Sequence, residues 1–119
     1  MNFEFTEEQK LLADAVRKFA QAELETDALK RAHNPRFPFD VAQRMSRQGL
    51  MGITLAEADG GQGGSLMDAV IAIEQVASVC PRSADVVQSA ASGRFAPLRN
   101  MRRHRSGIAI SQACCPAAR

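Results

Sequence analysis

The amino-acid sequence predicts an all-α fold: a small helical bundle over residues 1–88, followed by an irregular basic tail over residues 89–119. Apolar residues recur at helical spacing as far as about residue 88 and lose that spacing afterwards. The distribution of charge also changes near this position. All 13 acidic residues lie within residues 1–93, whereas residues 94–119 hold six Arg and no acid. With 119 residues, 45% of them hydrophobic and 24% charged, the chain has the size and composition of one small globular domain.

The first predicted helix spans residues 7–25. Thr6 and Gln9 have the spacing of a capping box, in which each side chain accepts a hydrogen bond from a free backbone N–H group at the helix start. Its apolar face comprises Leu11, Leu12, Ala15, Val16, Phe19 and Ala20. A weaker helix is expected over residues 27–32, before a turn at residues 34–38, where two prolines stop helical structure.

A short helix is expected next over residues 39–48, with Gly49 as its C-terminal cap and residues 50–53 packed into the core. The glycine cluster at residues 59–64 predicts a flexible turn. It lacks the strand and the glycine spacing of a nucleotide-binding loop, so we do not expect it to hold phosphate.

The strongest helical pattern spans residues 66–79. Ser65 is its expected N-terminal cap, and its broad apolar face is typical of a helix buried on most sides. Pro81 either ends this helix or opens the next, and residues 83–88 again read as helix.

Composition and motifs exclude several classes of protein. No apolar run approaches the roughly 20 residues that span a bilayer, and the polar start is not a targeting peptide, so we expect a cytoplasmic protein without membrane contact. Three Cys and two His, poorly spaced, predict no metal site and no disulfide framework. The arginine-rich tail lacks interleaved aromatics, and we expect no nucleic-acid binding.

Few residues suggest chemistry by themselves. Glu74 is an acid within an apolar helical stretch, which either faces a cavity or, in the alternative we favour, points to solvent. Arg82 and Ser83 lie at a helix start and either bind an anion or act as a surface arginine and a simple cap. His33 has no catalytic partner at suitable spacing. No catalytic constellation can be assembled from the sequence.

Several short segments, in order, resemble the N-terminal helical domain of the acyl-CoA dehydrogenase family. The resemblance covers residues 1–88, and Ala56 and Asp59 depart from it, since the family usually has Pro and often Tyr there. The segments that carry it are FTEEQ at residues 5–9, FP at 37–38, GLMGI at 49–53, GGQG at 60–63, IEQVA at 73–77 and CPRSADVVQ at 80–88.

The resemblance implies a three-part enzyme with FAD between its later domains, in which a glutamate removes the α-proton of an acyl-CoA thioester and a hydride passes to the flavin. The first domain would mainly wall the acyl pocket. Glu74 and Gln75 would lie near that wall, and Arg82 with Ser83 would correspond to an Arg-Ser pair that holds a distal carboxylate in the glutaryl-CoA branch.

The family further implies an acyl-CoA substrate, an electron-transfer acceptor and a homo-oligomer for the full-length protein. Because this chain lacks the flavin domain and the base, we expect a fragment that binds no FAD and catalyses nothing alone. It should also expose apolar surface that the other domains would cover.

The tail suggests a frameshift. When codons for residues 91–101 are chosen and read from their third base, they can encode FGPIRTFAEY. Codons for residues 108–115 can likewise encode RYLPGLL. Both are amino-acid sequences that resemble those of the family. We therefore expect residues 89–119 to be out-of-frame translation.

Two other functions remain open. One is a stand-alone helical interaction module that binds a partner protein, and the other is a nucleic-acid binder that uses the arginine tail.

Overall fold

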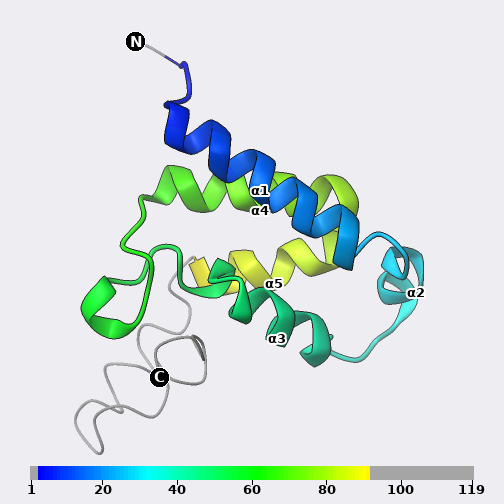
Figure 1. Cartoon of the computed structure of the whole chain (residues 1–119). Coiled ribbons are helices and arrows are strands. Elements are labelled where there is room, and N and C mark those ends of the chain that lie inside the picture. The colour runs from blue at the N-terminus through cyan, green and yellow to red at the C-terminus, as the bar shows by residue number, and fades with distance from the viewer. Residues whose placement is uncertain (1–2, 92–119) are drawn as a thin grey trace, which may run out of the picture.

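The computed structural model describes residues 3–91, which form five α-helices and two short 3-10 helices and contain no strand. Figure 1 shows their arrangement. The elements, in chain order, are α1 (Glu7–Glu23), α2 (Ala28–His33), α3 (Phe39–Arg47), η1 (Leu50–Gly52), η2 (Glu57–Asp59), α4 (Leu66–Val79) and α5 (Pro81–Ala91). The predicted all-α bundle is therefore confirmed.

The helices pack around α4 and α5. Helix α1 lies along α4, while α3 and η1 lie beside α5, and α2 closes the end of the bundle next to α5 (Figure 1). One continuous apolar core holds these elements together. It contains Val16, Ala20, Leu24, Val41, Met45, Leu50, Ile53, Ala69, Ala72, Val76, Cys80, Ala84, Val86 and Val87.

The capping box predicted at the start of α1 is present. The Gln9 backbone N–H donates to Thr6 Oγ1 at 3.2 Å, and the Thr6 N–H donates to Gln9 Oε1 at 3.0 Å. The helix ends at Glu23, two residues before the predicted end, and α3 begins at Phe39 as predicted. Gly49 follows α3 with φ of 79°, a left-handed conformation that glycine adopts without steric cost.

The glycine cluster is a closed loop rather than an open, flexible turn. Backbone N–H groups of four successive residues, 61–64, donate to carbonyls of residues 52–56 at 2.7–3.0 Å. At Gly61 the chain passes so close to Leu55 that an added Cβ would lie 2.2 Å from the Leu55 carbonyl oxygen. These contacts fix the loop, which directly precedes α4, against η1 and the residues that follow η1.

Helix α4 spans the predicted residues, and Pro81 opens α5. Helix α5 continues to Ala91, although the loss of apolar spacing predicted its end near residue 88, and Ala91 itself packs against the core. Thr54 Oγ1 donates to the Ala91 carbonyl at 3.3 Å and ties the end of the helix to the loop. The remainder of the predicted tail, residues 92–119, lies outside the described residues.

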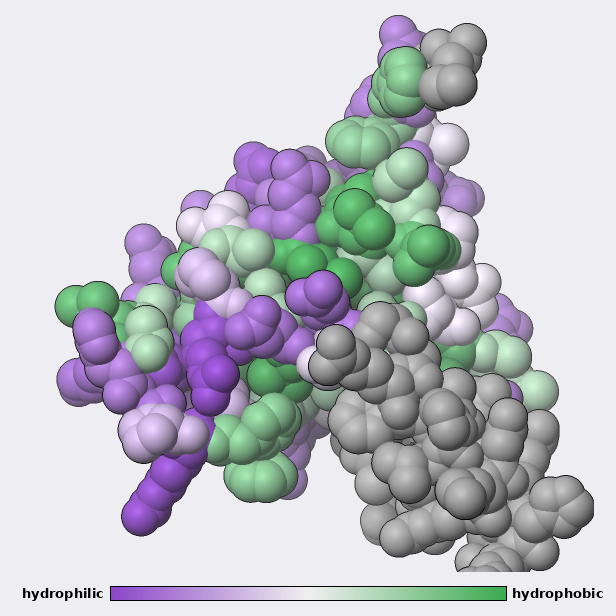
Figure 2. All heavy atoms as spheres, turned by 180° about the vertical axis from the view of Figure 1, so that it is seen from behind, coloured by the Kyte–Doolittle hydropathy of each residue, from purple (hydrophilic) through white to green (hydrophobic). Residues whose placement is uncertain are grey.

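Part of the apolar face of α4 is exposed, unlike the prediction of a helix buried on most sides. Leu66 is 69% exposed, Met67 51% and Val70 49%, because α1 and α5 cover the helix on its other sides. Figure 2 shows the molecule from behind, with apolar side chains gathered in the upper half. Over residues 3–91, no helix combines the length and apolarity that crossing a bilayer requires.

Candidate functional site

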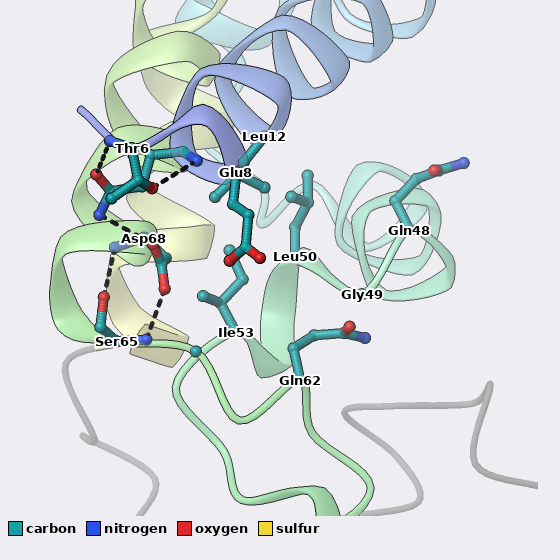
Figure 3. Close-up of a pocket in the computed structure, with 12 residues that line it drawn as sticks. Thr6, Glu8, Leu12, Gln48, Gly49, Leu50, Ile53, Gln62, Ser65 and Asp68 are labelled. Carbon is teal, nitrogen blue, oxygen red and sulfur yellow. Dashed lines mark hydrogen bonds between the residues drawn. The ribbon is translucent and has the colours of Figure 1, made fainter.

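A cavity of about 460 Å³ opens where the start of α1 meets the start of α4. Figure 3 shows that α1, the end of α3, η1 and the glycine loop supply its walls. Its lining residues are Thr6, Glu8, Gln9, Leu12, Gln48, Gly49, Leu50, Ile53, Gln62, Gly64, Ser65 and Asp68. The volume falls within the range of small-molecule or side-chain pockets.

Two linked capping boxes form one wall of this cavity. The Ser65 N–H donates to Asp68 Oδ2 at 2.8 Å, and the Asp68 N–H donates to Ser65 Oγ at 3.2 Å. Gln9 Nε2 then donates to Asp68 Oδ1 at 3.5 Å and joins the α4 box to the α1 box. The hydrogen bonds from Ser65, backbone first and hydroxyl second, hold the pKa of Asp68 below its usual 3.8, and Gln9 adds to them.

The opposite side of the cavity is apolar at its base and polar at its rim. Figure 3 shows Leu12, Leu50 and Ile53 at the base. The Glu8 carboxylate extends between them and the two capping boxes, and Gln48 and Gln62 lie on the far side. Such a lining suits an apolar side chain with a hydrogen-bond donor. It does not suit FAD, because two carboxylates and no basic residue line the cavity, and a pyrophosphate would be repelled.

The predicted site residues lie elsewhere. Glu74 is exposed on α4, and Gln75 accepts a hydrogen bond from Arg17 Nε at 2.8 Å, which links α4 to α1. Ser83 is fully buried near the start of α5, where its hydroxyl donates to Cys80 Sγ at 3.1 Å. None of Glu74, Gln75, Arg82 or Ser83 lines the cavity described above.

Arg82 carries an unusual feature for a half-buried arginine. Its Nε is buried, and it has no hydrogen-bond partner among the described residues. A buried donor without an acceptor costs about 1–3 kcal/mol. An acceptor contributed from outside residues 3–91 would remove that cost.

Cys80, which the sequence left without a role, is the centre of a buried polar cluster. It receives hydrogen bonds from Ser83 Oγ and, at 3.5 Å, from Arg31 Nη1, which also donates to the Leu24 carbonyl at 2.7 Å. Burial alone would raise the pKa of the Cys80 thiol, but the Ser83 hydrogen bonds and the Arg31 guanidinium together hold it below its usual 9.0. The cluster fastens α2 to the junction of α4 and α5.

Sequence reasoning missed Asp68 and its link to Gln9. The Ser-x-x-Asp spacing of Ser65 and Asp68 is a capping-box signal and was available in the sequence, but the contact across 59 residues to Gln9 was not. Within residues 3–91, no group of three or more His, Cys, Asp or Glu side chains is arranged to hold a metal ion.

Comparison with known proteins assigns the fold to a family. A sequence model described as "Acyl-CoA dehydrogenase, N-terminal domain" matches residues 6–101. The chain belongs to the acyl-CoA dehydrogenase family. The family match covers most of the helical bundle and extends past Gln88 into residues 89–101, and the helical, strand-free structure of residues 3–91 agrees with it.

Relatives in this family have several activities. The short-chain-specific acyl-CoA dehydrogenase of Clostridium acetobutylicum is 35% identical over 100 residues, which are 84% of this chain and 26% of that protein. A 3-sulfinopropanoyl-CoA desulfinase of Paraburkholderia xenovorans is 32% identical over 99 residues (83% and 23%). A subunit of the caffeyl-CoA reductase–Etf complex of Acetobacterium woodii is 34% identical over 76 residues (63% and 20%). The chain spans about a quarter or less of the length of these three relatives.

Proposed function

We propose that the chain is the N-terminal part of an FAD-dependent acyl-CoA dehydrogenase, which introduces a double bond between the α and β carbons of an acyl-CoA thioester. The observation that carries this proposal is the family match over residues 6–101. Relatives named as acyl-CoA dehydrogenases support the reaction, and a relative that belongs to an Etf complex supports an electron-transfer protein as acceptor.

In this function the domain contributes part of the wall of the acyl pocket, through Glu74, Gln75 and Arg82, whereas Ser83 is fully buried and does not itself face the pocket. The buried and unpartnered Nε of Arg82 supports an anionic group at the distal end of the acyl chain, because a guanidinium pairs well with a carboxylate or sulfinate. A relative whose name specifies a sulfinate-bearing acyl-CoA supports the same class of substrate. Ser83 would act on Arg82 indirectly, because its own hydroxyl is committed to Cys80.

We propose that residues 1–119 alone are inactive and bind no FAD. The cavity between α1 and α4 has the wrong charge for a pyrophosphate, and Cys80 and Ser83 are fully buried and so closed to substrate. Purified chain should therefore reduce no electron acceptor when supplied with acyl-CoA thioesters. Reduction above the background rate would contradict this part of the proposal.

The first experiment is to resequence the gene over the codons for residues 86–119 and about a kilobase beyond. An insertion or deletion of one or two bases near the Gln88 codon, or a shifted frame that runs on as a long open frame, would support out-of-frame translation of residues 89–119. Codons that cannot encode family text in any frame would refute it. The continuous frame, once expressed, would then be tested for FAD and acyl-CoA oxidation.

Substrate class is tested in that continuous protein with Arg82→Gln. We expect KM for an acyl-CoA with a distal carboxylate to rise by about tenfold or more, and KM for a plain acyl-CoA of equal length to change little. Arg47→Gln removes the same charge from an exposed site on α3 and is the matched control. An equal rise in KM for both substrates in Arg82→Gln would exclude recognition of a distal anionic group by Arg82.

A stand-alone interaction module is the second candidate. It is favoured by the exposed Leu66, Met67 and Val70 and by the apolar base of the α1–α4 cavity. Co-purification of the chain with a separately encoded β-domain protein would support it. Loss of that complex in Met67→Glu, but not in a variant of the exposed polar Gln43, would locate the surface on α4.

A further inference from the structure

A second cavity, of about 510 Å³, lies between α2 and α3 at the end of the bundle remote from the start of α1. The turn that joins the two helices forms its rim. The lining residues are Asp27, Lys30, Arg31, Asn34, Arg36, Phe37, Pro38, Phe39, Asp40 and Arg44. Neither the acyl-pocket residues proposed above nor the residues of the first cavity contribute to it.

Basic groups outnumber acidic groups in this lining by four to two. Asp27 lies 3.4 Å from Lys30 Nζ and offsets that charge, whereas Asp40 has no ion pair with a described residue. Arg36 is exposed and likewise forms no ion pair within residues 3–91. Its guanidinium is therefore available to an anion that enters the cavity.

The other two guanidinium groups of the lining are held in place before any ligand arrives. Arg31 is anchored by the Leu24 carbonyl and by Cys80. Arg44 is anchored by the Glu23 carbonyl at 3.3 Å and by the Glu23 carboxylate at 3.5 Å. Because these anchors use a single nitrogen of each guanidinium, the other N–H groups can still donate, and less side-chain entropy is lost on binding.

Aromatic rings line the same cavity. Phe37 and Phe39 meet edge to face, with ring centroids 4.7 Å apart, and they are 49% and 76% exposed. Exposed phenylalanine rings beside guanidinium groups with unused N–H donors form a combination that can stack a planar base and pair with its phosphate. The end of the molecule that carries α2 lies at the left of Figure 2, where hydrophilic side chains predominate around a few apolar ones.

We propose that the α2–α3 cavity binds a nucleoside diphosphate, with the base against Phe37 and Phe39 and the phosphates on Arg36 and Arg31. Asp40 is an acidic residue of α3 in this lining and repels negative charge. It therefore favours a ligand whose anionic part lies toward α2. This binding does not depend on the proposed dehydrogenase function.

The test is a titration of the whole 119-residue chain with ADP, adenosine and inorganic phosphate, followed by backbone amide NMR shifts. ADP should bind with Kd below about 1 mM and shift amides of residues 27–44, while adenosine and phosphate alone bind at least about tenfold more weakly. Arg36→Gln should weaken ADP binding by about tenfold, and Phe39→Leu by several-fold. Arg47→Gln, an equal loss of charge outside the cavity, should leave Kd unchanged.

Three results would overturn the proposal. The first is the absence of amide shifts in residues 27–44 at millimolar ADP. The second is a set of shifts confined to residues 92–119, which would show that the arginines of that segment bind the phosphates instead. The third is a Kd for inorganic phosphate equal to that for ADP, together with a Kd for ADP that Phe39→Leu leaves unchanged. This result would exclude recognition of the base.

Discussion

Gln9 Nε2 lies 3.5 Å from Asp68 Oδ1, and this contact joins the capping boxes of two helices whose starts are 59 residues apart. One carboxylate thus accepts hydrogen bonds from the start of its own helix and from the side chain that caps another. The Asp68 carboxylate thus interacts with the first turns of both helices, where the helix dipole favours negative charge.

Asp68 makes stability depend on acid pH. Hydrogen bonds hold the pKa of Asp68 below 3.8 in the folded state. Its contribution to the free energy of unfolding is therefore complete at pH values above the pKa of the unfolded state, and it is lost as the pH falls through the pKa of the folded state. We expect Asp68→Asn to be less stable at neutral pH by about 1 kcal/mol. It should also lose less stability than the unchanged protein between pH about 5 and the folded pKa.

Urea unfolding at a series of pH values measures both effects. Asp14→Asn, on the exposed surface of α1, is the matched control and should follow the unchanged protein. Parallel curves for Asp68→Asn and the unchanged protein would contradict a folded-state shift at this group.

Met45 and Met67 provide a matched pair for testing the core. Met45 is a fully buried residue of α3, whereas Met67 is 51% exposed on α4. We expect Met45→Ala to lower the free energy of unfolding by about 2–5 kcal/mol and Met67→Ala by no more than about 0.5 kcal/mol. Thermal unfolding followed by circular dichroism would show a large fall in Tm for the first variant alone. Similar losses for both would mean that Met67 is covered in solution.

Arg31 is expected to matter far more than its neighbour Lys30. Arg31→Met leaves the Leu24 carbonyl without the Arg31 donor and leaves Cys80 Sγ with Ser83 Oγ alone, which should cost about 1–3 kcal/mol. Lys30→Met removes an exposed ion pair with Asp27 and should cost no more than about 0.5 kcal/mol. The comparison uses chemical denaturation at one pH, and an equal cost for the two variants would argue against the buried cluster as the anchor of α2.

The glycine loop offers a third comparison. Gly61→Ala would place a Cβ against the Leu55 backbone, and we expect a loss of about 1–3 kcal/mol as the loop moves away. Gln62→Ala changes the next residue, which is exposed, and should be nearly neutral. If Gly61→Ala were as stable as the unchanged protein, the loop could not be packed as closely as described.

The helices themselves could be predicted well from local signals. The cap at Thr6, the cap at Ser65, the prolines at 35 and 38 and the apolar spacing in α4 each act within a few residues, so the sequence shows them directly. The end of α5 was predicted too early, because the packing of Ala91 against the core and its hydrogen bond with Thr54 do not show in the spacing of apolar residues.

The polar interior was much harder to predict. Ser83 looked like a surface cap, yet it is buried against Cys80, and Cys80 looked incidental, yet it lies at the junction of three helices. The link from Cys80 to α2 depends on Arg31, which lies 49 residues before Cys80. Periodicity carries no information about a contact of that separation, so the family resemblance could suggest a role for Ser83 but not its surroundings.

A segment as rich in glycine as residues 60–64 is ordinarily where a protease cuts first and where amide hydrogens exchange fastest. Here the backbone donors of residues 61–64 are all engaged with carbonyls of η1 and the residues that follow it. The segment should therefore exchange slowly and resist cleavage in the folded protein, while the turn at residues 34–38, with far fewer such bonds, is cut before it.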